Sequence, residues 1–310
     1  MYQEGLNVLA ISKMNPYVSI CICTFRRPEK LSKLLFRLIN QIDEQIYPVE
    51  IIIVDNDNNR SAKPTVDKIK TATPIKIKYY CELIQNISLA RNKAVSVAKG
   101  DLIIFIDDDE YPSNKWLDNL LLFYNNNACD GVFGPVKPVF EVPPPSWIIR
   151  SKIFEREEHP SGYVARLGDM RTGNVLLKRN LLLEDRNAFD PKYGLVGGED
   201  TEFFKRMTER GYKFLWCQEA TVFETIPKER LTIDYQIKRA LGRGKFWSMM
   251  TPFASLSNLK SLAAIISYFC MSPFIMMRGL SSFNMYLIKT SDHLGKLLGY
   301  LRINRTEQYK

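Results

Sequence analysis

Three apolar segments of strand length, each followed at once by polar residues, limit the folds open to this chain more than any other feature of the sequence. They read YVSICICTF, VEIIIVDN and DLIIFIDDD in chain order. The second and third are apolar without alternation, which is typical of strands buried on both faces of a parallel sheet. Between the first two, Pro28 precedes leucines spaced as on one face of a helix. A strand, a helix and a second strand predict a right-handed crossover, so we expect an open α/β sheet.

The same pattern continues beyond the second strand. IKIKYY is typical of another strand, and SLARNKAVSVAKG of a helix that ends at Gly100. Ligands of open α/β sheets bind outside the carboxyl ends of the strands. Polar groups stand at three of the expected strand ends, namely Thr24 with Arg26 and Arg27, Asp55, and Asp107 to Asp109. We therefore expect a ligand site along one edge of the sheet.

Three consecutive carboxylates, Asp107, Asp108 and Asp109, follow the apolar run LIIFI. Like charges at this spacing raise each other's pKa, and a divalent cation commonly offsets the repulsion. We expect Asp107 to end the strand, which would place Asp107 and Asp109 on one side and Asp108 on the other. A magnesium or manganese ion held by Asp109 and by a diphosphate would suit such hard oxygen ligands. The alternative is an acidic turn that caps the following helix.

Five segments resemble, in order and spacing, the family 2 glycosyltransferases with the GT-A fold. They are CTFRRPEKL, IIIVDN, NISLARNKA, GDLIIFIDDDE and GGEDTEFFKRM, which together cover about residues 17–230. The later segments RALGRGKF and LGKLLGYL are more similar to the bacterial exopolysaccharide and capsule branch. The resemblance implies a GT-A fold with a Rossmann-like open mixed sheet, a nucleotide diphosphate sugar donor, preferably UDP-linked, a divalent metal (Mn²⁺ or Mg²⁺) and an inverted product. It also implies a saccharide acceptor, lipid-linked, in surface polysaccharide synthesis.

The resemblance assigns donor contacts to residues at the strand ends and on one helix. It implies that the nucleotide contacts Thr24, Phe25, Arg26, Asp55, Arg91, Asp107 and Asp108. Asp107 and Asp109 would hold the metal. Taken singly, each of these residues is as easily explained by the start of a helix or by a surface charge, so the prediction depends on their occurring together.

Two later segments carry the catalytic and acceptor predictions. The glycines of GGED permit a sharp turn before a helix, and the resemblance makes Glu199 and Asp200 the catalytic residues. Asp200 would be the general base that takes the proton of the attacking acceptor hydroxyl. A simple helix N-cap is the alternative for Asp200, and the two roles are compatible. Within GNVLLKR, the resemblance implies that Gly173 and Asn174 line the acceptor pocket.

Two positions depart from the family pattern. Many relatives carry a histidine near VFETIP, where this chain has Glu224, which leaves the contact at that position open. Processive synthases carry a QxxRW motif, whereas QIKRALGRG lacks the tryptophan, which favours addition of a single sugar. Arg239 and Arg243 lie four apart on an expected helix, where they would either face the diphosphate or lie on the surface.

All of the excess positive charge lies in the last quarter of the chain. Residues 228–310 contain thirteen Lys or Arg against four Asp or Glu, an excess of nine that equals the formal net charge of the whole chain. Such a basic segment suits an anionic membrane surface or nucleic acid as partner, and a solvated face that aids solubility explains the charge alone equally well. Its longest apolar run, SLAAIISYFCMSPFIMM, is interrupted by Pro273, so we expect it to attach to a membrane without spanning it. The alternative is a core helix packed against the catalytic domain.

These features predict a GT-A catalytic domain at residues 1–230 and a basic, helical, membrane-associating extension at residues 231–310. Six cysteines without a paired framework, and no recognisable signal sequence, favour a cytoplasmic protein on the inner face of the membrane. The rival enzyme class is a sugar-phosphate nucleotidyltransferase, which would need a glycine-rich loop that CTFRRPEKL lacks. A basic binding protein without activity would leave the DDD and GGED segments unexplained, and we expect no nucleic acid partner. The sequence indicates no oligomeric state.

Overall fold

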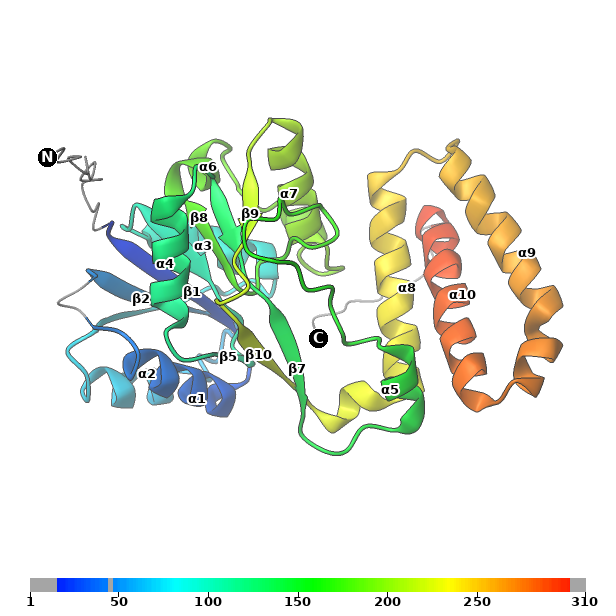
Figure 1. The fold of residues 1–310 in the computed structure, drawn as a ribbon, viewed down its shortest axis with the longest axis horizontal. Helices are drawn as coiled ribbons and strands as arrows, with labels where there is room; N and C mark the ends of the chain where they lie inside the picture. Colours follow the sequence, from blue (N-terminus) through cyan, green and yellow to red (C-terminus); the bar gives the residue numbers. More distant parts are fainter. Residues whose placement is uncertain (1–15, 44–46, 302–310) are drawn as a thin grey trace, which may run out of the picture.

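A seven-stranded mixed sheet forms the centre of the computed structural model, which describes residues 16–43 and 47–301 (Figure 1). Its strands, in chain order, are β1 (Val18–Thr24), β2 (Val49–Asp55), β3 (Lys76–Cys81), β4 (Leu102–Phe105), β6 (Gly131–Phe133), β8 (Val175–Lys178) and β9 (Phe214–Trp216). They are arranged in the order β3-β2-β1-β4-β8-β6-β9. The first four in this order are parallel, and β8 runs antiparallel to both β4 and β6. The open α/β sheet that the apolar runs predict is confirmed.

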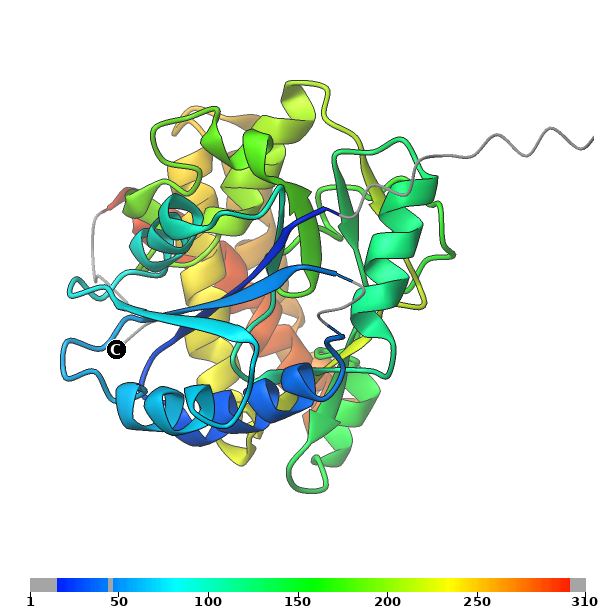
Figure 2. The same ribbon diagram turned by 90° about the vertical axis from the view of Figure 1, so that its left-hand side faces the viewer.

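Two apolar cores cover the two faces of this sheet, because alternate residues of each strand point to opposite sides. In β1, Ile20 and Ile22 belong to one core and Cys21 to the other. The first core is completed by helices α1 (Pro28–Ile39), α2 (Lys63–Lys70) and α4 (Trp116–Asn126). The second is completed by helices α3 (Ile87–Val97), α6 (Arg179–Leu183) and α7 (Glu199–Glu209). The sheet therefore lies between two helical layers (Figure 2).

A second, three-stranded sheet begins directly after the acidic run. Its strands are β5 (Glu110–Pro112), β7 (Val136–Phe140) and β10 (Val222–Ile226), in the order β5-β10-β7. The central strand β10 pairs antiparallel with β5, which sets Glu224 opposite Glu110. Short helices follow β7 and β10, namely α5 (Ser146–Ser151) and the 3₁₀ turn η2 (Lys228–Leu231); another 3₁₀ turn, η1 (Pro191–Tyr193), precedes α7.

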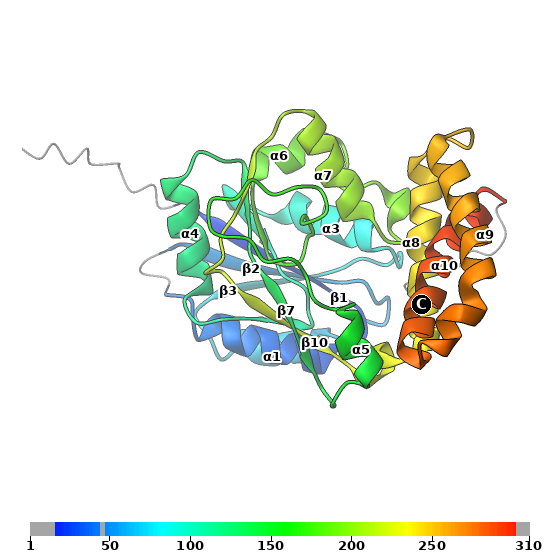
Figure 3. The ribbon, with the colours of Figure 1, turned by 45° about the vertical axis from the view of Figure 1, so that its right-hand side comes forward.

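Three long helices follow the sheets, α8 (Ile233–Met250), α9 (Leu256–Met277) and α10 (Leu280–Tyr300). They stand beside the sheet region, with α10 between α8 and α9 (Figures 1 and 3). The backbones of α8 and α10 touch at glycines: a Cβ on Gly244 would collide with the carbonyl oxygen of Asp292, and one on Gly295 with that of Leu241. Arg243 joins the same two helices by two hydrogen bonds, of 3.0 and 2.9 Å, to Asp292.

Helix α9 packs against α10, and most of its remaining surface is exposed. Its apolar side chains include Phe269, which is 82% exposed, and Phe274, which is 69% exposed. The alternative of a core helix packed against the catalytic domain is therefore wrong. The helix also continues past Pro273 to Met277, so the proline does not end it. Among the described residues, α9 is the one helix whose length and composition would suffice to cross a membrane.

Candidate active site

The carboxyl ends of β1, β2 and β4 bring polar groups together at one edge of the large sheet. Thr24 and Asp55 stand opposite each other in the pairing of β1 with β2. The hydroxyl of Thr24 donates a 2.7 Å hydrogen bond to Oδ2 of Asp108, which follows β4. The structure thus joins strand ends that are 84 residues apart in the chain, at the edge where a ligand of an open α/β sheet is expected.

The acidic run forms a turn rather than the end of a strand. Because β4 ends at Phe105, the alternation of side chains no longer applies at residues 107–109. The expectation that Asp108 faces away from Asp109 is therefore wrong. Nη1 of Arg27 bonds to both, at 3.0 Å from Asp108 and 3.2 Å from Asp109. Asp107 lies apart from this pair, with Oδ1 at 3.7 Å from Nη2 of Arg91.

Burial makes the ionised form of this acidic turn costly. It raises the pKa of Asp108 to about 6, although Arg27 acts in the opposite direction. It also raises the pKa of Glu110 well above its usual value, and the neighbouring Asp107 adds to the rise. Asp107 is the accessible member of the turn, with 47% of its side chain exposed against 6% for Asp109.

The donor set of the turn fits a divalent metal. Six carboxylates meet four guanidinium groups here: Asp107, Asp108, Asp109, Glu110, Glu199 and Glu224 against Arg27, Arg91, Arg156 and Arg230. Carboxylates therefore outnumber guanidinium groups at the turn, and a bound cation would favour their ionised form. Carboxylate oxygens are also the ligands that magnesium and manganese prefer. Asp107 and Asp109 are accordingly able to serve as ligands.

Glu224, the departure from the family pattern, holds two arginines in place. Its two carboxylate oxygens accept hydrogen bonds of 2.8 Å from Arg156 and 2.8 Å from Arg230. Arg230 in turn donates a 3.1 Å bond to Oδ2 of Asp109. Glu224 is therefore connected to the acidic turn through Arg230.

Arg91 and Glu199 form a buried ion pair beside Asp107. The side chain of Asn86 caps α3 by accepting a 3.2 Å hydrogen bond from the backbone N–H of Leu89, and Arg91 lies one turn further along. Nη1 of Arg91 donates to Oε1 of Glu199, and the two side chains are 7% and 3% exposed. Burial raises the pKa of Glu199 to about 7, against the opposing effect of Arg91. The predicted roles in nucleotide binding and catalysis thus fall on two residues that are joined to each other.

Asp200 is the second residue of helix α7, directly after Glu199, and is partly exposed. Gly197 and Gly198 adopt φ angles of 87° and 91°, which make the sharp turn that the two glycines predict. The cap position of the helix is Gly198, so Asp200 is not the N-cap residue. Oδ1 of Asp200 accepts a 2.7 Å hydrogen bond from the backbone N–H of Thr201. Its role as general base stays a prediction.

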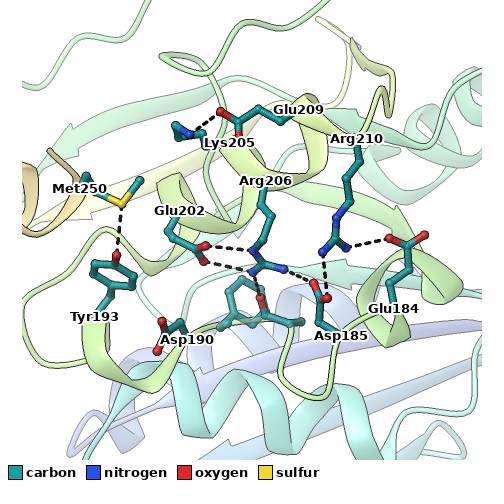
Figure 4. A network of polar contacts seen from close by, with 12 residues as sticks. Glu184, Asp185, Asp190, Tyr193, Glu202, Lys205, Arg206, Glu209, Arg210 and Met250 are labelled. Atoms are coloured by element: carbon teal, nitrogen blue, oxygen red, sulfur yellow. Dashed lines mark hydrogen bonds and ion pairs between the residues drawn. The ribbon is translucent and has the colours of Figure 1, made fainter. Parts of the chain in front are cut away.

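A network of ion pairs holds helix α7 against the loop before it (Figure 4). Arg206 of α7 bonds to Glu202 at 2.9 Å and also to Asp185. Arg210, just after the helix, bonds to Glu184 at 3.0 Å and to Asp185 at 2.9 Å. The bonds from Arg206 and Arg210 thus hold the C-terminal end of α7 against the segment that contains Glu184 and Asp185.

The predicted nucleotide residues divide into buried and accessible ones. Asp55 is fully buried, and its Oδ2 accepts hydrogen bonds from Ala62 N at 2.8 Å and Tyr79 Oη at 2.9 Å. Arg26, by contrast, has 60% of its side chain exposed, and its guanidinium lies 4.8 Å from the centre of the Phe25 ring. Phe25 and Arg26 thus form the accessible part of the predicted nucleotide site, and Asp55 supports the loop behind these two residues.

The two predicted acceptor residues also differ in accessibility. A Cβ on Gly173 would lie 2.6 Å from Oε1 of Glu110 and 3.2 Å from Oδ2 of Asp107, so the acidic turn packs directly on this glycine. Asn174 is fully buried with φ at 59°. Its amide accepts from Trp116 Nε1 at 2.7 Å and donates to two backbone carbonyls at 2.7 and 2.9 Å. Contact with an acceptor stays a prediction for both.

A pocket of about 270 Å³ opens beside Gly173, and its lining includes Arg156 and Arg171. Two further lining residues, Glu157 and Asp169, and the buried His159 place their ligand atoms within 4.8 Å of one another, a spacing that a metal ion could use. His159 is already bonded to Asp169 at 3.1 Å and stacked on the ring of Tyr163 at 3.9 Å. These contacts account for the buried histidine without an ion.

Sequence reasoning named Arg27 among the polar groups at the strand ends without giving it a role, and it missed Arg156, Arg171 and Arg230 as site residues. Arg27 stands next to the predicted Arg26 in CTFRRPEKL, and the paired arginines were a visible signal. No sequence pattern indicated the other three, because they come from segments distant in the chain. Arg230, for example, is 121 residues from Asp109. Of the two arginines whose position was left open, Arg243 belongs to the contact between α8 and α10, and Arg239 lies one turn before it on α8, where its charge lowers the pKa of Arg171.

Comparison with known proteins gives concordant matches. The family described as Glycosyl transferase family 2 matches residues 19–182. The succinoglycan biosynthesis protein ExoM of Rhizobium meliloti is 30% identical over 94% of this chain and 96% of its own length. The glycosyltransferase AglE of Haloferax volcanii is 23% identical over 80% of this chain and 79% of its own.

Two solved structures share the fold at low sequence identity. One is the mannosyltransferase PcManGT from Pyrobaculum calidifontis in complex with GDP-Man and Mn²⁺, with a TM-score of 0.61, 15% identity and coverage of 94% of this chain and 88% of that one. The other is S. aureus TarS 1-349 in complex with UDP-GlcNAc, with a TM-score of 0.53, 14% identity and coverage of 95% and 97%. The expected GT-A fold with C-terminal helices is confirmed.

Proposed function

Because the chain belongs to glycosyl transferase family 2, we propose that it transfers a single sugar, with inversion, from a nucleotide diphosphate sugar to a saccharide acceptor. We take the donor to be UDP-linked. One observation carries the proposal: Arg91 lies between Asp107 of the acidic turn, at 3.7 Å, and Glu199, the neighbour of Asp200. One guanidinium group thereby connects the acidic turn, where we propose that the donor binds, with the start of α7, which carries the proposed base.

Each part of the site has a defined task in this reaction. Asp107 and Asp109 would hold a divalent metal, which when bound supplies Lewis-acid stabilisation of the leaving diphosphate. Arg27 and Arg230 hold Asp109 in position. Asp200 takes the proton of the acceptor hydroxyl while the hydroxyl oxygen attacks the anomeric carbon from the face opposite the diphosphate. Attack from that face inverts the anomeric configuration.

The setting we propose is surface polysaccharide synthesis at the cytoplasmic face of a membrane, with residues 1–230 as catalytic domain and 231–310 as membrane-associating extension. Two findings support it. The relative from Rhizobium meliloti is named for succinoglycan biosynthesis. Helix α9 lies on the side of α8 and α10 away from the catalytic sheet (Figure 3), and many of its apolar side chains are exposed, as a membrane-associated element requires. A lipid-linked acceptor would then reach the site from the membrane surface.

Two substitutions test the assignment of base and metal ligand. Asp200→Asn should lower turnover by roughly 10² to 10⁴ and leave UDP affinity nearly unchanged, the range expected for loss of a general base. Asp109→Asn should abolish manganese-dependent UDP binding measured by calorimetry. Asp234→Asn, an exposed carboxylate on α8, is the matched control and should change neither quantity. Full turnover in Asp200→Asn, or unchanged manganese-dependent binding in Asp109→Asn, would contradict the assignment.

A further inference from the structure

The backbone turn at Gly197 and Gly198, here called the glycine turn, sets the place of Asp200. Within the described part of the chain, the carboxylate of Asp200 accepts hydrogen bonds from Thr201 alone, which is the next residue. Gly198 is the cap residue of α7, and its carbonyl oxygen accepts a 2.9 Å hydrogen bond from the backbone N–H of Glu202. The position of the proposed base therefore follows the backbone of the glycine turn.

Helix α8, from the C-terminal extension, contacts the glycine turn directly. Phe246 of α8 is 5% exposed, and its ring lies on Gly198. A Cβ added to Gly198 would stand 2.5 Å from Cε2 and 2.6 Å from Cγ of that ring. The Phe246 ring thus occupies the space in which a side chain at position 198 would lie. Because glycine has no side chain, α8 can approach the turn this closely.

The same helix holds the segment that leads into the glycine turn. The ring of Tyr193 meets that of Phe246 edge to face, with centroids 5.5 Å apart and an angle of 70° between the planes. The hydroxyl of Tyr193 donates a 3.2 Å hydrogen bond to Sδ of Met250, one helical turn beyond Phe246 (Figure 4). The backbone carbonyl of Tyr193 in turn accepts a 2.8 Å bond from the N–H of Gly197. Helix α8 therefore contacts both the start of this segment, at Tyr193, and its end, at Gly198.

The neighbouring parts of the segment and of α7 are held by the catalytic domain itself. At the start of α3, the side chain of Asn86 donates a 2.8 Å hydrogen bond to the Pro191 carbonyl and packs on Gly194. The network of Arg206 and Arg210 holds the C-terminal end of α7. The glycine turn lies between these two supports, and α8 is the element that packs on it.

Core packing does not account for the two aromatic side chains. Among the described residues, neither of the apolar cores on the two faces of the sheet includes Phe246 or Tyr193. The ring of Phe246 lies instead against Tyr193, Trp247 and Gly198. Loss of this ring should therefore release the glycine turn and leave the packing of both cores in place.

We propose that Phe246 is a positioning residue for sugar transfer, which holds the glycine turn so that Asp200 meets the acceptor hydroxyl. The inference rests on the proposed transferase function, with Asp200 as its base. A displacement of about 1 Å in a catalytic group can slow a reaction by roughly 10²-fold. Loss of the Phe246 contact should thus act on turnover more than on donor binding. Helix α8 is thereby a part of the active site, although it belongs to the membrane-associating extension.

Hydrogen exchange of the full chain, measured by mass spectrometry on the peptide that contains Gly197, tests the contact without turnover. Phe246→Ala should raise the exchange rate there by roughly tenfold or more, because the bond from Gly197 to Tyr193 opens more often. Phe246→Leu keeps an apolar side chain on the turn and should restore most of the protection. Ile288→Ala removes a side chain on α10 that is 3% exposed; it is the control and should leave this peptide unchanged. Unchanged exchange in Phe246→Ala would overturn the proposal.

Steady-state kinetics separate positioning from a general loss of structure. The assay is UDP release from UDP-glucose, UDP-galactose and UDP-N-acetylglucosamine, with the methyl glycosides of the same sugars as acceptors. Phe246→Ala should lower kcat by roughly 10- to 10²-fold and leave KM for the donor within about twofold. Phe246→Leu should recover most of kcat. Ile288→Ala should keep kcat even where it lowers the temperature of unfolding.

Three kinetic results would contradict the positioning role. They are an unchanged kcat in Phe246→Ala, an equal loss of kcat in Ile288→Ala, and a raised KM for the donor with kcat unchanged. Absence of UDP release by the unmodified chain would count against the transferase function itself. The exchange experiment would then still decide whether Phe246 holds the glycine turn.

Discussion

Removal of either member of the Arg91–Glu199 pair should destabilise the protein far more than removal of both. The side chains are only 7% and 3% exposed, so each single substitution leaves a buried charge without its partner. Breaking such a pair costs about 3–5 kcal/mol, whereas replacing both members with apolar residues of similar size is often close to neutral. Additive effects of Arg91→Met and Glu199→Met would total about 6–10 kcal/mol. We expect the double variant to lose about 3 kcal/mol or less, which is a coupling energy of at least about 3 kcal/mol.

The coupling can be measured by urea unfolding, followed by tryptophan fluorescence, of the unmodified chain, the two single variants and the double variant. A matched cycle on the same helix uses Lys205 and Glu209, whose side chains are 42% and 61% exposed. That exposed pair should show a coupling of only about 0.3–0.5 kcal/mol. If the Arg91 and Glu199 effects add to within about 0.5 kcal/mol, the pair does not contribute as a buried unit and the reasoning is refuted.

The pH dependence of the same cycle provides a second check. The raised pKa of Glu199, about 7 against an ordinary 4.5, means that the native chain holds this proton more tightly than the unfolded chain. The stabilisation from this group is therefore full below the ordinary value and is lost as the pH rises through about 7. At about pH 5.5 the carboxyl is mostly protonated, so Arg91→Met should cost less than at about pH 8. A cost independent of pH would contradict the raised pKa.

Two further substitutions test the roles of Asn174 and α9. Asn174→Ala removes three buried hydrogen bonds and leaves Trp116 Nε1 without an acceptor. This substitution should lower the free energy of unfolding, measured in urea, by about 3 kcal/mol or more. A loss below about 1 kcal/mol would show that the amide does not stabilise the fold. Phe269→Glu combined with Phe274→Glu should reduce sedimentation with anionic liposomes by about tenfold or more, because each change removes exposed apolar surface and adds a repelled charge. Phe36→Glu, an equally exposed position on α1, is the control, and an equal loss there would remove α9 from the membrane contact.

Local patterns in the sequence predict the sheet and its ligand edge well. The spacing of apolar residues depends only on neighbours in the chain. This spacing was therefore enough to predict β1, β2 and β4 and the helices between them. The position of Thr24, Asp55 and Asp108 at one edge follows from the parallel order of these strands. The end of β4 was harder to predict. A run of carboxylates ends the strand earlier than the apolar pattern of the sequence indicates.

The partners of the acidic turn could not be predicted, because they come from distant segments. Arg27 is 81 residues from Asp108, and Arg230 is 121 residues from Asp109. The choice between Arg26 and Arg27 depends on backbone conformation, since Arg26 adopts a φ of 55° that turns the chain between the two side chains. The exposure of α9 likewise depends on tertiary packing, because an apolar helix has the same composition whether its faces are covered or exposed.

The glycine contacts between α8 and α10 have a mechanical consequence. Where Gly244 and Gly295 let the two backbones touch, no layer of flexible side chains lies between the helices to absorb a displacement. The salt bridge from Arg243 to Asp292 opposes sliding at the same level. The two helices therefore resist displacement relative to each other. A movement of α9, which packs against α10, would accordingly be passed on to α8 as well.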